Sequence, residues 1–119
     1  MAENDKASVE VEGGSTYEEV LETGKYKLSR PYKFGDGSEQ KVLNFPLKDM
    51  TGQHIRTAQA NYETVEGRAL PSLAETNKTY QAYVVTALMD VQPDFVFGLP
   101  ARDFTALTLS VQRFLLNLD

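Results

Sequence analysis

The spacing of the hydrophobic residues changes partway along the chain, and this change restricts the fold more than any other feature. Between residues 25 and 47, apolar and aromatic side chains alternate with charged or polar ones on both sides of a Gly-Asp-Gly-Ser turn at 35–38. A period of two around a glycine-containing turn predicts a β-hairpin over residues 25–47. Pro31 has no N–H to donate, so we expect the first strand to lie at a sheet edge or to contain a bulge there.

Three later segments change to a spacing of three or four residues between apolar side chains, as in an amphipathic helix. They predict helices over about residues 51–66, 72–89 and 100–117. Because an isolated hairpin is only marginally stable in water, its apolar face must rest on these helices. The sequence therefore predicts an α+β fold, in which an N-terminal β-hairpin packs on a small bundle of three main helices and residues 25–119 form a single domain.

Local signals predict where these helices begin and end. Thr51 is a candidate N-cap for the first helix, and Gly67 is expected to end it. Ser72 and Glu75 form a capping box at the start of the second helix, and the third follows Pro100. The residues expected in the core, helix by helix, are Ile55, Ala58, Tyr62 and Val65; Leu73, Thr76, Tyr80, Val84, Ala87 and Leu88; and Phe104, Leu107, Val111, Phe114, Leu115 and Leu118.

The linker between the second and third helices is rich in large apolar residues. It has room for about one helical turn after Pro93, and a fully buried side chain of this size contributes about 1.5–3 kcal/mol. We expect Phe95 and Leu99 to fill the core, and the sequence leaves the positions of Val96 and Phe97 open.

The first 24 residues concentrate negative charge. Seven acidic residues and one lysine give residues 1–24 a net charge of −6, whereas the whole chain carries −5. Low hydrophobicity with high charge cannot offset the entropy of ordering, so we expect a disordered acidic leader over residues 1–24. Such a leader either keeps the protein in solution or acts as a partner-binding arm. It lacks the features of a signal peptide, and we expect no membrane-spanning segment.

Few residues in the chain are suited to catalysis or metal binding. The sequence has no cysteine and one histidine, His54, which excludes thiolate zinc sites, iron–sulfur clusters and sites built from several histidines. We expect His54 on the surface or beside a helix cap. Three aspartates near predicted helix starts, Asp90, Asp94 and Asp103, are expected to cap helices or interact with their dipoles. We therefore expect no catalytic, metal-binding or cofactor-binding residues and no enzymatic activity.

The predicted hairpin has a local excess of positive charge. Its cations are Lys25, Lys27, Arg30, Lys33 and Lys41, against the acidic Asp36 and Glu39. This face could bind nucleic acid, meet an acidic partner or the chain's own acidic leader, or simply be solvated. A net charge of −5 argues against nucleic acid as a partner, because phosphate binding requires a basic surface.

The order of several short motifs resembles a known family. LETGKYKLSRPYKF, a glycine-containing turn and VLNFPLKDMTGQHI are similar to the start of the small tail assembly chaperones of long-tailed phages and prophages, including siphoviruses and myoviruses. AYVVTALMDV, FVFGLPARDF and SVQRFLLNLD resemble that family's closing arrangement of a helix of small apolar residues, Leu-Pro-x-x-Asp-Phe and a helix ending in Phe-Leu. The resemblance covers residues 21–119. The sequence departs from the family at His54, where an acidic residue is frequent, and in the bulkier Phe95-Val96-Phe97 linker.

The resemblance implies a non-enzymatic protein of the bacterial host cytoplasm that is absent from the mature virion. Members of the family bind the tape measure protein or the tail tube protein before the tail polymerises. Some are also made as a longer, frameshifted form, which would be a further partner, and self-association is compatible with this role. Two alternatives remain, a structural virion component such as a tail completion or connector protein, and a small nucleic-acid-binding regulator.

Four apolar residues are the candidates for partner binding. Val85, Leu109 and Leu116 lie off the main stripes of their helices, and the linker residue Phe97 is the fourth. Exposed apolar patches often mark interaction sites, although these leucines could instead pack against the hairpin. The edge of the hairpin offers a second mode of docking by strand addition, which Pro31 and the lysines weaken.

Overall fold

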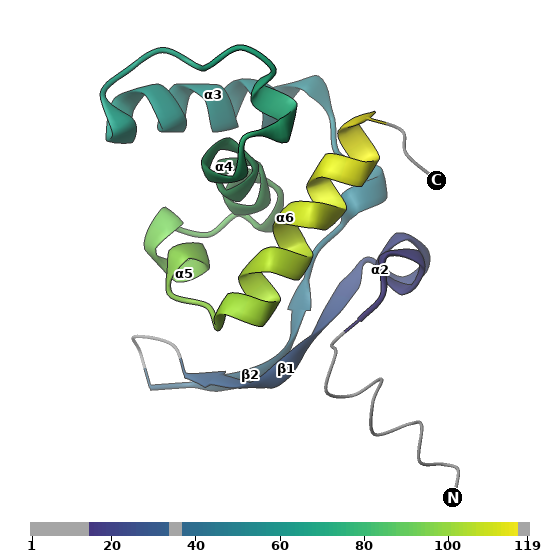
Figure 1. The fold of residues 1–119 in the computed structure, drawn as a ribbon. Coiled ribbons are helices and arrows are strands. Elements are labelled where there is room, and N and C mark those ends of the chain that lie inside the picture. Colours follow the sequence, from purple (N-terminus) through teal and green to yellow (C-terminus); the bar gives the residue numbers. More distant parts are fainter. Residues whose placement is uncertain (1–14, 34–36, 117–119) are drawn as a thin grey trace, which may run out of the picture.

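A computed structural model describes residues 15–33 and 37–116, and these form an α+β fold (Figure 1). A two-stranded antiparallel hairpin packs with several helices, as predicted in outline, and the helix α4 lies at the centre of the helices. The elements are α2 (Tyr17–Thr23), β1 (Lys25–Lys33), β2 (Glu39–Asn44), the 3-10 turn η1 (Leu47–Asp49), α3 (Gly52–Glu66), the 3-10 turn η2 (Ala74–Thr76), α4 (Lys78–Met89), α5 (Pro93–Phe97) and α6 (Ala101–Leu116).

Helix α4 lies at the centre because it is buried on nearly every side. It packs against α3, α5, α6 and η2, and a helix surrounded in this way must be apolar all round rather than along one stripe. Its buried residues are Tyr80, Gln81, Ala82, Tyr83, Val84, Val85, Thr86 and Leu88. The prediction that Val85 lies outside the core is therefore wrong, because the position off the main stripe faces another helix instead of solvent.

The predicted start of this helix at Ser72 is also wrong. Leu73 adopts a left-handed backbone conformation with φ of 54°, which is incompatible with an α-helix that begins at Ser72. Only the short turn η2 follows it. Helix α4 starts later, where the Asn77 side chain accepts a hydrogen bond from the Tyr80 N–H at 2.9 Å. Leu73 is 76% exposed and Thr76 is exposed, so neither belongs to the predicted core stripe.

The hairpin and helix α3 agree with their predictions. The strands pair from Lys25↔Asn44 to Lys27↔Val42, and the register shifts before Tyr32↔Gln40, so the irregularity predicted near Pro31 is present. Thr51 caps α3, and Gly67 ends it with φ of 73°. His54 completes this cap, because its Nδ1 accepts a hydrogen bond from the Thr51 N–H at 2.9 Å. Val65 is 61% exposed, contrary to its predicted place in the core.

The expectation of disorder over residues 1–24 is wrong for its last part. Residues 17–23 form helix α2, because Thr16 and Glu19 make a reciprocal capping box and Val20 is buried in the core. Gly24 then ends the helix with φ of 70° and leads into β1. Residues 1–14 lie outside the described part of the chain.

The last two helices follow the prediction, except that a different linker residue is buried. Helix α5 is the single turn expected after Pro93, and Leu99 beyond it is buried as predicted. Within α5, however, the buried side chain is Val96, whereas Phe95 is only half-buried. In α6, Leu107 and Val111 are fully buried, and three further predicted core residues, Phe104, Phe114 and Leu115, pack half-buried against them. Leu118 lies outside the described residues. Helix α6 packs beside α4 and starts next to the end of α5 (Figure 1).

Candidate partner-binding surface

Helix α6 exposes two leucines on its outer face. Leu109 is 50% exposed and Leu116 is 39% exposed. Seven residues correspond to two helical turns, so both side chains project from the same side of the helix, about 10 Å apart along its axis. Two of the four predicted partner-binding residues thus share one surface, which we call the α6 outer face.

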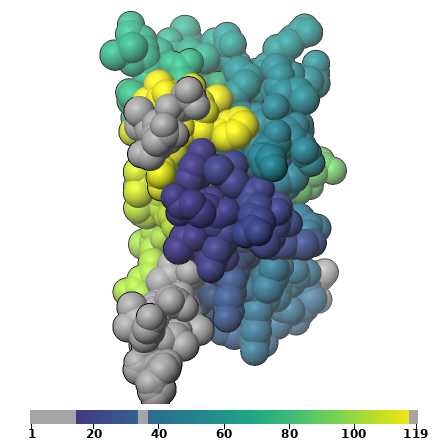
Figure 2. Space-filling model, turned by 90° about the vertical axis from the view of Figure 1, so that its right-hand side faces the viewer, coloured from purple at the N-terminus to yellow at the C-terminus, as the bar shows by residue number. Residues whose placement is uncertain are grey.

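Polar contacts fix both borders of the α6 outer face. On one side, Lys78 Nζ lies 3.3 Å from Thr105 Oγ1, and Gln81 donates a hydrogen bond of 2.8 Å to Gln112 Oε1. On the other side, the Arg113 guanidinium lies 4.1 Å from the centre of the Tyr17 ring and forms an ion pair of 3.6 Å with Glu18. Figure 2 shows the resulting neighbourhood, with α2 in purple next to the carboxyl-terminal part of α6 in yellow. The leucines therefore stand on a helix whose position is held by its neighbours.

Phe97, the third candidate, is exposed elsewhere. Its ring is 43% exposed and packs on Tyr83 and Phe104, with ring centres 5.6 Å and 5.7 Å away. Phe104 precedes Leu109 by five residues, which places their side chains about 140° apart around α6. Phe97 is thus a separate aromatic surface at the end of α5, and the structure does not bring it together with the leucine pair.

The base of this aromatic surface is anchored by a hydrogen bond. The Tyr83 hydroxyl donates to Glu66 Oε2 at 2.8 Å. Burial, with the adjacent Glu66 carboxylate as a second cause, raises the pKa of Tyr83 to about 12. Tyr83 consequently remains a neutral donor at physiological pH and links α4 to α3.

Val85, the fourth candidate, is fully buried inside α4. A partner could reach its side chain only after the helices around α4 separated. The structure therefore removes Val85 from the surface available for binding.

Asp103 is the polar residue whose environment the sequence did not predict. It is fully buried, and its Oδ1 accepts hydrogen bonds from the Tyr26 hydroxyl at 2.8 Å and the Ser29 N–H at 2.9 Å. Its Oδ2 accepts a third bond from the Ser29 hydroxyl at 2.9 Å. Burial, followed by the hydrogen bond to this carboxylate, raises the pKa of Tyr26. Asp103 lies in the first turn of α6 as expected, but its main role is to join α6 to the hairpin.

The spacing of residues in α6 contains a signal that Asp103 is buried. Asp103 precedes Leu107 by four residues and Ser110 by seven, so it falls on the buried side of α6. A polar residue on the apolar side of a helix requires a hydrogen-bonding partner, although the sequence does not reveal which one.

Most N–H groups along the first part of the free edge of β1 already have acceptors. The N–H groups of Lys25, Lys27 and Ser29 donate to the side chains of Thr23, Ser15 and Asp103 respectively, at 3.1, 2.7 and 2.9 Å. The next alternate position is Pro31, which has no N–H. Because these donors are used or missing, an added strand would find few N–H groups along this part of β1, which weakens this mode of docking further.

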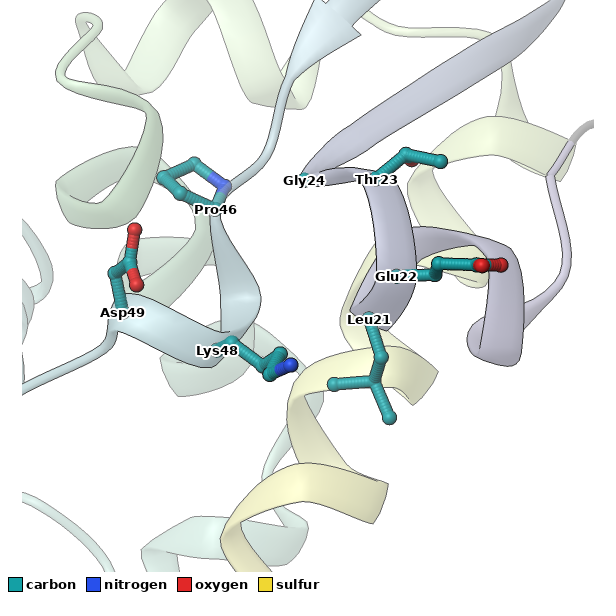
Figure 3. A pocket seen from close by; sticks show the side chains of 7 residues that line it. All are labelled: Leu21, Glu22, Thr23, Gly24, Pro46, Lys48 and Asp49. Atoms are coloured by element: carbon teal, nitrogen blue, oxygen red, sulfur yellow. The ribbon is translucent and has the colours of Figure 1, made fainter.

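A pocket of about 240 Å³ lies between the end of α2 and η1 (Figure 3). It is lined by Leu21, Glu22, Thr23, Gly24, Pro46, Lys48 and Asp49. The carboxylates of Glu22 and Asp49 project to opposite sides of this opening and do not converge (Figure 3). Within residues 15–33 and 37–116, no cluster of three or more metal-ligating side chains forms, and no helix is long and apolar enough to cross a membrane.

Comparison with protein-family models, curated proteins and solved structures finds no match to this chain.

Proposed function

We propose that the protein is a phage tail assembly chaperone that binds the tape measure protein, the tail tube protein or both before the tail polymerises. In this role it acts without catalysis in the bacterial host cytoplasm and is absent from the mature virion. The motifs over residues 21–119 carry the resemblance on which this proposal rests, and the α6 outer face is the observation in the structure that supports it best.

The physical argument is that the α6 outer face suits reversible binding of a helical partner. Leu109 and Leu116 present an apolar strip two turns long, and a partner helix could cover it with apolar residues at positions i, i+3 or i+4, and i+7. Covering a half-exposed leucine stabilises a complex by about 1 kcal/mol. The two leucines therefore favour binding, while the complex can still dissociate. The polar contacts along the borders keep the helix in place before the partner arrives.

Co-expression with the neighbouring tape measure and tail tube proteins tests this function. We expect a tagged form of the chain to retain one of these proteins in a pull-down, and mass spectrometry of purified particles to lack the chain. A stoichiometric amount in mature particles would contradict the chaperone role and would favour a structural virion component.

A further inference from the structure

The hairpin has a cationic outer face that no described residue covers. Lys25 and Lys27 pair with Asn44 and Val42, and residues directly opposite each other in a hairpin share one face. The opposite face carries Tyr26 and Leu43, which are buried in the core, so the four paired residues point outward and are exposed. We call this surface the hairpin outer face, on which Val42 lies directly opposite Lys27.

The charge of residues 1–14 complements the hairpin. Residues 25–44 carry a net charge of +3, and residues 1–14 carry −3. The acidic residues of that segment are Glu3, Asp5, Glu10 and Glu12, against Lys6. The apolar Val9 and Val11 alternate with the two glutamates, so the segment also contains side chains that could cover Val42.

The described chain begins beside this face. Ser15 Oγ accepts a hydrogen bond of 2.7 Å from the Lys27 N–H, which fixes the starting point of the preceding segment at β1. Glu10 is five residues before Ser15 and can reach up to about 17 Å from it, whereas Lys25 lies only about 7 Å along the strand from Lys27. Gly13 and Gly14 stand between Glu12 and Ser15, and glycine permits the sharp change of direction that such a return requires.

We propose that residues 1–14 bind across the hairpin outer face of the same chain. The tether at Ser15 makes this an intramolecular contact with an effective concentration in the millimolar range, so weak individual charge pairs suffice. The contact depends on salt, because the pairs are exposed to solvent. This inference concerns the hairpin and does not depend on the function proposed for α6.

A nitroxide label on the full-length protein tests the contact. The chain has no cysteine, so Ala7→Cys provides a unique attachment point in the segment. We expect the label to weaken the NMR amide signals of Lys25, Lys27 and Val42, and raising the salt to about 0.5 M should restore them by about twofold. The matched variant carries the same label with Glu10→Gln and Glu12→Gln, and there we expect a smaller signal loss and a smaller salt effect, because only Glu3 and Asp5 remain.

Two further variants test whether the contact depends on a lysine of the hairpin, and a mixing experiment tests whether it forms within one chain. Lys27→Gln should reduce the effect on Val42, whereas Lys48→Gln, an exposed lysine outside the hairpin, should leave it unchanged. Identical signal loss with and without the two glutamates would overturn the proposal, because a tether alone would then explain it. Signal loss between a labelled chain and a separate isotope-enriched chain would also overturn it, in favour of contact between two copies.

Discussion

Replacing Asp103 with alanine should destabilise the protein more than any other single change to a polar residue considered above. The carboxylate accepts three hydrogen bonds in a fully buried site, and the substitution leaves the Tyr26 hydroxyl and the Ser29 N–H without this acceptor. A hydrogen bond to a charged group contributes about 1.5–3 kcal/mol, and a buried donor left unpaired costs about 1–3 kcal/mol. Because the alanine site relaxes in part, we expect a net loss of about 3–5 kcal/mol.

Urea denaturation followed by circular dichroism measures this loss. For a domain of this size, each kcal/mol lowers the melting temperature by about 4–8 °C, so thermal unfolding should shift by more than about 10 °C. Tyr26→Phe removes one of the three bonds and should cost about 1–2 kcal/mol. The double variant should cost less than the sum of the two single variants, because both changes remove the same bond.

The exposed Asp49 supplies the control for this series. Asp49→Ala should change the free energy of unfolding by no more than about 0.5 kcal/mol. If Asp103→Ala were equally mild, the carboxylate would not join α6 to the hairpin, and the account of how these elements are held together would fail.

Three further predictions concern other parts of the fold. Burial and Glu66 raise the pKa of Tyr83 to about 12 from an unfolded value of 10.0. The contribution of Tyr83 to the free energy of unfolding is therefore fully present below pH 10 and is lost as the pH rises towards 12. Tyr83→Phe should reduce this loss of stability at alkaline pH in a series of urea titrations. Thr16→Ala removes the N-cap of α2 and should cost about 1 kcal/mol, measured by chemical denaturation, and no change would argue against the capping box. Gly98→Ala places a Cβ 2.6 Å from the Tyr32 hydroxyl, so we expect a lower melting temperature in calorimetry, whereas a rise would show that Tyr32 moves aside freely.

The sequence predicted the hairpin and α3 well because their signals are local. Alternation of side chains, Thr51 as a cap and Gly67 as a stop each depend on neighbouring residues, and no distant contact overrides them. The one-turn helix after Pro93 has the same character. These elements needed no knowledge of the rest of the fold.

The predictions that failed concerned residues whose structure depends on contacts distant in the sequence, or segments that were judged from their average composition. Val85 is buried because helices pack on α4 from several sides, and a stripe analysis assumes that only one side is covered. The charge averaged over residues 1–24 concealed the capping box at Thr16 and the apolar anchor Val20 of α2. Leu73 entered a left-handed conformation that no residue pattern had indicated.

The candidate surface was predicted only in part for the same reason. The stripe of α6 placed Leu109 and Leu116 off its main apolar side but left open whether they pack against the hairpin, and the structure shows both exposed. The partners of Asp103 lie more than seventy residues away in the chain, on β1. Such a contact follows from the way the hairpin docks and cannot be read from spacing.

The affinity of the purified chain for the tail protein proposed as its partner tests the central claim most directly. Leu109→Ser with Leu116→Ser removes the apolar strip of the α6 outer face, and Val65→Ser is the matched control on a more exposed apolar residue, which lies on α3. By titration calorimetry we expect the double variant to bind at least about tenfold more weakly, equivalent to about 1.4 kcal/mol, with the control unchanged. Equal affinity for the double variant and the unmodified chain would contradict the claim that this face binds the partner.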